Sequence, residues 1–322
     1  MTHIFETYSV IAVYSALVVY TVAFIAFTLD LARRSAPATA SVRTGTMATA
    51  SGGRATALLE RLATDAPATG YGSGKPSVPL RLAMGFTVVA WLLHVAAAVL
   101  RGLAAERVPW ANMFEFSLTA TAIIVGVFLA SQFWQDLRFL GVYITGFVIL
   151  LLAVASVNFY VPISPLPQSL QSAWLVIHVF VASLGTGFFA IGAGLSVAQL
   201  FQARREATGA GPRFLATLPS AAALENLAYR VILVGFVFWT FTLIAGAIWA
   251  QRAWGRYWGW DTKEVWTFII WTIFAGYIHA RATRGWRGSR SAWLAVVGFS
   301  AVMFNFTIVN LFFKGLHTYS GL

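Results

Sequence analysis

The sequence contains no cysteine. This absence excludes disulfide bonds, thiolate metal ligands and thiol redox chemistry by the chain itself, so any thiol in its chemistry belongs to a partner or a substrate. Charged residues are also scarce, at 10% of the chain, whereas 59% of the residues are hydrophobic. Such a composition is typical of polytopic membrane proteins and argues against a soluble enzyme.

The N-terminus lacks the basic residues that precede the apolar core of a cleaved signal peptide, and it carries an acid at Glu6. We therefore expect the first apolar run to remain as a membrane helix. Apolar runs long enough to cross ~30 Å of hydrocarbon recur along the chain. The predicted fold class is all-α, a polytopic membrane protein of about eight transmembrane helices, with spans at about 7–31, 81–103, 113–133, 139–160, 172–201, 226–250, 264–281 and 292–313.

Three regions differ in composition. Residues 1–32 contain the first predicted transmembrane helix, residues 33–80 form a basic segment rich in Ala, Thr, Gly, Ser and Pro, and residues 81–322 contain the other predicted spans. The composition of residues 33–80 is typical of a flexible loop, which we expect in the cytoplasm. We therefore expect the functional residues, including those that handle a ligand, in residues 81–322.

The net charge of +11 is distributed unevenly between the predicted loops. With the N-terminus outside, sixteen Lys and Arg residues fall on the cytoplasmic side and six on the outer side. This positive-inside bias predicts an N-out and C-out orientation in the plasma membrane. The excess of Lys and Arg over Asp and Glu thus reflects topology and contact with anionic lipid, and it does not predict nucleic-acid binding.

A tryptophan-rich segment, WGRYWGWDTKEVW, lies in the predicted outer loop between the sixth and seventh spans. Its DTKE portion is typical of a helix start, with Asp261 as the N-cap and Glu264 at the capping-box position. In "VPWANMFEF", Asn112 and Glu115 fit either a helix start or support for a histidine or a substrate. The acids of the tryptophan-rich segment are therefore accounted for by local structure.

The tryptophans need a different explanation. An interfacial belt accounts for Trp249, but it fits poorly for Trp254, Trp258 and Trp260, which lie in a Gly-containing loop. Stackable indoles beside cations match the apolar faces and carboxylates of a porphyrin, although a quinone or an aromatic drug has similar requirements. The nearby cations are Arg252, Arg256 and Lys263.

Histidines can decide between these ligands, because imidazole ligates haem iron. His178 and His317 fall on the outer side with the tryptophans, and as a pair they favour a metal-bearing ligand. A lone histidine there is more often an interfacial side chain. His94 and His279 lie roughly 13 and 22 Å below the outer boundary at ~1.5 Å per residue, so they need not bind one iron. Both are candidate ligands of a haem within the membrane, and His279 fits a cytoplasmic-interface residue equally well.

With these residues the sequence resembles the CcsA or ResC type of haem-handling protein of system II cytochrome c biogenesis. This group belongs to the wider cytochrome c assembly family, which shares a tryptophan-rich WWD segment. Here the external WWD segment is 252–264, and "PWANMFEF", "AWLVIHV", "YIHAR" and "GLHTYSG" match further family segments. The resemblance covers roughly residues 85 to 322. Phe114 replaces a family tyrosine, and Thr262 stands where proline is common.

The resemblance implies a subunit of a holocytochrome c synthase-type complex that carries haem b as cargo. His178 and His317 would be the axial ligands, and the WWD residues would present haem to the CxxCH motif of an apocytochrome c. The resemblance also implies a CcsB or ResB type membrane partner, since this chain has no large external loop. No catalytic residue is assigned.

Two other functions stay open from the residues. The first is a b-type haem electron-transfer subunit, which would need histidine pairs at matching depths in two helices. The second is a membrane transporter of a hydrophobic or anionic solute, with Arg101 and Glu115 along its path. The transporter hypothesis leaves the WWD segment unexplained.

Overall fold

A computed structural model describes residues 2–35 and 76–317. The loop predicted for residues 33–80 falls largely outside these ranges. The described chain is helical, with no strand in either range. Its helices are α1 (Thr2–Ser35), α3 (Val78–Ala105), α4 (Met113–Ser131), α5 (Gly141–Asn158), α6 (Ala173–Thr208), α7 (Ala221–Trp254), α8 (Thr262–Thr283), α9 (Ser289–Phe306) and α10 (Ile308–Phe312). Short 3-10 turns occur at Arg138–Leu140, Gln168–Leu170 and Arg213–Thr217.

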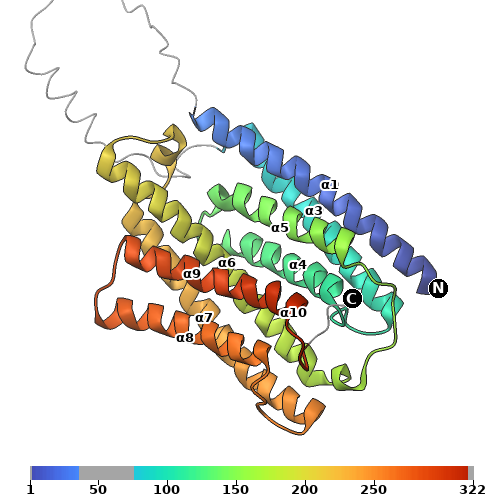
Figure 1. Ribbon diagram of the computed structural model, residues 1–322. Helices are drawn as coiled ribbons and strands as arrows, with labels where there is room; N and C mark the ends of the chain where they lie inside the picture. The colour runs from blue at the N-terminus through green and yellow to red at the C-terminus, as the bar shows by residue number, and fades with distance from the viewer. Residues whose placement is uncertain (1, 36–75, 318–322) are drawn as a thin grey trace, which may run out of the picture.

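The predicted all-α membrane fold is confirmed. Within the described residues, seven spans are long and apolar enough to cross a membrane, and the last of them joins α9 and α10. The seventh predicted span along the chain, 264–281, forms the helix α8 but is not among these seven. Its aliphatic residues are diluted by Trp, Thr, Gly, Tyr and His, which lowers its mean hydropathy. The N-terminal end of α1 and the C-terminal end of α10, both predicted to face outside, lie at the same end of the bundle (Figure 1). The N-out orientation itself stays a prediction.

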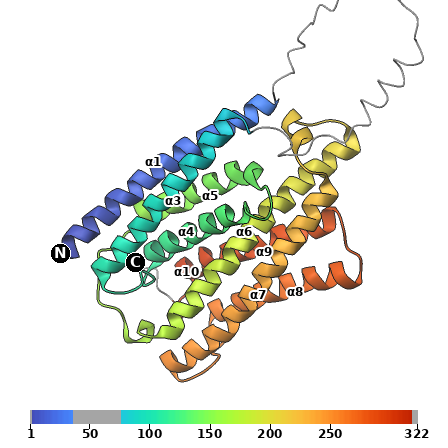
Figure 2. The same ribbon diagram turned by 180° about the vertical axis from the view of Figure 1, so that it is seen from behind.

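The helices form one elongated bundle with α6 near its centre. α6 packs against α4, α7 and α9, whereas α1 and α3 pair along one edge and α8 lies at the opposite edge (Figures 1 and 2). Aromatic rings fill the centre: the Phe189 ring of α6 stacks on the Phe274 ring of α8 with 3.7 Å between centroids. This arrangement places the start of α6, the end of α7 and the start of α8 at one end of the bundle.

A buried ionic network fixes the same end of α1, α3 and α4. Arg101 Nε donates to Glu115 Oε1 at 3.0 Å, and Arg107 Nη1 donates to Glu115 Oε2 at 2.7 Å. Arg101 also pairs with Glu6 at 3.2 Å. Asn112 Oδ1 accepts from the Glu115 amide at 2.9 Å, so the predicted helix start is confirmed. Since a buried ion pair broken on one side leaves an uncompensated charge, these groups serve the packing of three helices.

Candidate functional site

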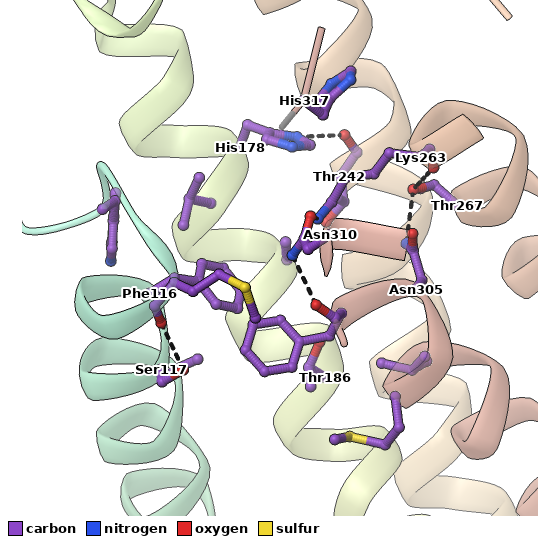
Figure 3. Close-up of a pocket in the computed structure, with 18 of the residues that line it drawn as sticks. Phe116, Ser117, His178, Thr186, Thr242, Lys263, Thr267, Asn305, Asn310 and His317 are labelled. Atoms are coloured by element: carbon purple, nitrogen blue, oxygen red, sulfur yellow. Dashed lines mark hydrogen bonds between the residues drawn. The ribbon is translucent and has the colours of Figure 1, made fainter. Parts of the chain in front are cut away.

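A cavity lies between α4, α6, α7, α8, α9 and α10, at the end of the bundle where α6 and α8 begin. Its empty volume is about 1220 Å³, part of which is open to solvent. Most of its wall is apolar or aromatic, which is typical of sites for flat apolar ligands. The polar side chains that converge on it include His178, Thr242, Lys263, Asn305, Asn310 and His317 (Figure 3).

His178 enters the cavity from the second turn of α6. Its Nδ1 lies 3.0 Å from the Thr242 carbonyl oxygen of α7 (Figure 3). Because a carbonyl only accepts, this contact places the proton on Nδ1 and leaves the lone pair on Nε2. A histidine whose second nitrogen is fixed in this way is typical of a metal ligand.

Gly246 makes room for this imidazole. A Cβ atom at position 246 would lie 2.8 Å from His178 Cε1 and 2.9 Å from His178 Nδ1, closer than side chains normally approach. Gly246 follows Thr242 by four residues, so both lie on one face of α7. Sequence reasoning missed this glycine, and its spacing from Thr242 is the one local signal that could have pointed to it.

His317, in the segment after α10, reaches the same region. Its ring lies edge-on to Trp249 and Trp254, with centroids 5.5 and 4.8 Å away. His317 Nδ1 lies 3.5 Å from Asp261 Oδ1. Asp261 Oδ2 accepts from the Leu316 amide at 2.6 Å, which holds the residue before the histidine. Among the described residues His317 Nδ1 has no hydrogen-bond partner, so Asp261 holds this histidine through the Leu316 amide, less directly than Thr242 holds His178.

Asp261 also begins α8, as predicted. Its Oδ1 accepts from the Lys263 amide at 2.9 Å. Glu264 Oε2 accepts from the Asp261 amide at 3.1 Å and from the Gly259 amide at 2.8 Å, which completes the capping box. The carboxylate that caps the helix is thus the same one that contacts the histidine.

The charge of Asp261 is stabilised by its neighbours. Burial alone would raise the pKa of the Asp261 carboxyl, but the His317 side chain and the backbone amides of Lys263 and Leu316 hold this pKa well below its ordinary value. The carboxylate is therefore ionised at neutral pH. A Cβ at Gly315 would overlap this carboxylate, so glycine there lets the chain pass close to Asp261.

Trp249 contacts both imidazoles, and its predicted position in an interfacial belt is wrong. The side chain is buried, with 2% of its surface exposed. Its Nε1 donates to the Ser169 carbonyl at 3.0 Å, which satisfies inside the protein the donor that a belt tryptophan offers to the interface. Its ring stacks on His178 with centroids 5.8 Å apart and an 18° angle. Trp249 is thus a shared wall of the site.

The rest of the WWD segment divides into two groups. Trp254 contacts His317, whereas Trp258, Trp260 and Arg256 are not among the residues that line the cavity. Trp260 has a positive φ of 58° and is 79% exposed. Trp258 packs edge-on against Trp260 with 5.9 Å between centroids. Arg256 lies against Gly259 at the surface. These three side chains form an outer surface of the loop.

His94 and His279 are not brought together. His94 is buried, with Tyr20 Oη 3.3 Å from its Nδ1 and Thr121 Oγ1 3.5 Å from its Nε2. His279 is exposed near the end of α8, 3.3 Å from Thr283 Oγ1. α3 and α8 lie at opposite edges of the bundle (Figures 1 and 2). Neither histidine is among the cavity-lining residues.

Comparison with known proteins agrees with this architecture. Residues 86–317, which include both His178 and His317, match the family described as Cytochrome C assembly protein. The chain belongs to the cytochrome c assembly protein family. Similar family members are the cytochrome c biogenesis protein CcsA of Microcystis aeruginosa, 34% identical over 77% of this chain and 90% of that protein, and CcsA of Gloeobacter violaceus, 32% identical over 76% and 88%. CcsA of a Synechococcus strain is 34% identical over 77% and 88%.

The close approach of the His178 ring to Gly246 gives a testable prediction. Gly246→Ala is expected to push the His178 ring out of place and, under the function proposed below, to weaken haem binding about tenfold to a hundredfold, the usual effect of disturbing the support of a metal ligand. Titration of the purified chain with haem, followed by absorbance, measures the change. Gly276→Ala is the matched control, because a Cβ there meets nothing within 4 Å. Equal affinities for both variants would contradict the role given to Gly246.

Proposed function

We propose that this chain is the haem-handling subunit of a cytochrome c synthetase. In this role it binds haem between His178 and His317 on the extracytoplasmic side of the plasma membrane and presents it to the CxxCH motif of an apocytochrome c. The observation that carries the proposal is a pair of imidazoles that both contact Trp249, with Nδ1 of His178 3.0 Å from the Thr242 carbonyl and Nδ1 of His317 3.5 Å from Asp261 Oδ1.

The donor set fits a haem iron. Imidazole nitrogen is a common axial ligand of haem, and the partner on the second nitrogen fixes the orientation of the ring. Thr242 supplies this partner for His178, and Asp261 Oδ1 lies 3.5 Å from Nδ1 of His317. Trp249, Trp254 and the apolar cavity wall offer the surfaces that a porphyrin face requires.

The chemistry of attachment also suits a chain without cysteine. Covalent attachment forms thioether bonds between haem vinyl groups and the substrate's cysteine thiols. This chain has no thiol to compete with them. Its own residues would hold the ring, exclude water from one side of it and orient the His178 imidazole with its lone pair on Nε2. The bonds themselves are made by groups of haem and of the substrate.

The exposed part of the WWD segment supports a contact with other proteins. Trp260 and Tyr257 are 79% and 61% exposed in the loop that precedes α8. Aromatic residues are enriched where proteins bind one another. We place the apocytochrome and a CcsB or ResB type membrane partner at this side of the chain.

The two alternative functions are less well supported. An electron-transfer subunit would need His94 and His279 to serve a shared haem, but they lie in helices at opposite edges of the bundle. A transporter would need Arg101 and Glu115 to face a solute, but they pair with each other at 3.0 Å and neither lines the cavity.

Loss of the chain should separate two classes of cytochrome. We expect cells without it to lose covalently bound c-type haem while b-type cytochromes persist, because only covalent attachment needs this site. Haem staining of denatured proteins and reduced difference spectra measure the two classes. The wild-type chain should restore c-type cytochromes, and a His178→Ala/His317→Ala double variant should not. Loss of b-type haem together with c-type haem would contradict the proposal.

A further inference from the structure

A polar cluster lines the cavity where α8, α9 and α10 meet. The Lys263 ammonium donates to Asn310 Oδ1 (Figure 3). Asn305 Nδ2 donates to Thr267 Oγ1 at 3.3 Å, and Thr267 Oγ1 donates to the Lys263 carbonyl at 2.7 Å. All four residues line the cavity, below or beside the two histidines in Figure 3. The cluster is therefore a polar wall in a mainly apolar space.

The Lys263 ammonium interacts with the Asp261 carboxylate only at a distance. Among the residues that the structure describes, no carboxylate forms a salt bridge with Lys263, and its side-chain partner is the neutral amide of Asn310. Lys263 is also the one Lys or Arg among the cavity-lining residues described. A charge withdrawn from water is costly unless it is paired. The cavity thus offers a positive charge that no carboxylate of the described chain contacts directly.

Asn305 gives a second and independent sign of a missing ligand. This residue is 5% exposed, it lines the cavity, and its Oδ1 is buried without a hydrogen-bond partner. Buried polar atoms are nearly always hydrogen-bonded, so an unsatisfied one indicates a group that belongs there. Its Nδ2 has two N–H groups and donates one of them to Thr267 Oγ1, so the second is available to a ligand in the cavity. Asn305 is then a donor to an anion.

The other cations near the WWD segment do not reach this space. Arg252 lies over the Trp174 ring, with its guanidinium carbon 6.0 Å from the ring centroid. Arg256 is exposed and lies against Gly259. Neither lines the cavity. Of the three cations singled out in the sequence, Lys263 is therefore the one placed to meet a ligand that also contacts His178.

We propose that Lys263, Asn305 and Asn310 form a carboxylate-binding subsite of the cavity. This inference rests on the proposed function, under which the carboxylate is a propionate group of haem. A carboxylate there pairs directly with the Lys263 ammonium and accepts from the amide of Asn305. Because the two carboxylates of haem share one edge of the ring, binding them at this wall turns the vinyl edge away from α8, α9 and α10. The subsite thereby sets the orientation of haem relative to the substrate's thiols.

Haem and its dimethyl ester, in which both carboxylates are blocked, test the subsite. The full-length chain, purified in detergent, is titrated with each compound, and binding is followed by absorbance. Wild-type protein should bind haem more tightly than the ester. Lys263→Met should weaken haem binding on the order of tenfold or more, the range of a charge-assisted hydrogen bond, and leave ester binding unchanged. Lys263→Arg should retain most of the preference for haem.

Lys314→Met is the matched control, since Lys314 is exposed after α10. It should leave both affinities unchanged. Equal losses of haem and ester affinity in Lys263→Met would overturn the subsite and leave Lys263 as a structural residue. Equal wild-type affinities for both compounds would also overturn it, while haem binding itself stood. If wild-type protein bound neither compound, the proposed function would fail before the subsite came into question.

Discussion

Under the proposed function, replacing His178 with alanine should abolish the axial ligation of bound haem on one side, and added imidazole should restore it. The side chain enters the cavity from α6 with Nδ1 on the Thr242 carbonyl, so Nε2 faces the ligand. Loss of a direct ligand should exceed the tenfold to hundredfold effect of losing its support, so we expect haem affinity to fall at least about 100-fold. Absorbance spectra with and without imidazole measure both the loss and the rescue.

The control for this prediction is His279→Ala. His279 is exposed on α8 and is not among the cavity-lining residues, so its replacement should leave the external haem spectrum unchanged. A His178→Ala protein that folds and keeps the wild-type spectrum would show that His178 packs against Trp249 without binding iron. Failure of imidazole to restore the spectrum of an otherwise folded variant would point the same way.

Replacing Asp261 should have the second largest effect, because this carboxylate does two jobs. Asp261→Ala removes the cap of α8, which costs about 1 kcal/mol of stability, and releases the Leu316 amide and the His317 imidazole. We expect haem affinity to fall about tenfold to a hundredfold. Thermal unfolding and haem titration measure the two losses separately.

Asp261→Asn separates these jobs. Asparagine caps helices as well as aspartate does, so the stability of α8 should persist. The negative charge beside His317 is lost, so the haem affinity should still fall, by less than in the alanine variant. Wild-type affinity in Asp261→Asn would mean that the charge does not orient the histidine. Wild-type affinity in both variants would remove Asp261 from the site altogether.

Local patterns in the sequence were sufficient to predict much of this architecture. Long apolar runs predict helices because a membrane helix satisfies its backbone internally, and each predicted span is helical. The DTKE pattern predicts the capping box because donor and acceptor lie three residues apart. His178 and His317 could be proposed as a pair because both lie near the ends of predicted spans, on the same side of the membrane.

Features that depend on contacts between distant segments could not be predicted. Trp249 resembles a belt residue until the Ser169 carbonyl, 80 residues earlier, is found beside its indole nitrogen. His94 has partners on α1 and α4, whose packing against α3 no local pattern specifies. The path of the WWD loop, with Trp260 in a left-handed conformation, leaves all three predicted haem-contacting tryptophans, Trp254, Trp258 and Trp260, outside the set of cavity-lining residues.

The two histidines differ in how firmly the chain anchors them. His178 lies inside α6, a 36-residue helix, and its ring is enclosed by α7 at Gly246. His317 lies beyond the last described helix, and Asp261 is the polar group that holds its segment. A ligand on a tail can withdraw without moving the bundle, whereas one inside a packed helix cannot. Under the proposed function, the histidine of the substrate's CxxCH motif would therefore displace His317 first. His178 would stay bound to haem until its transfer to the apocytochrome is complete.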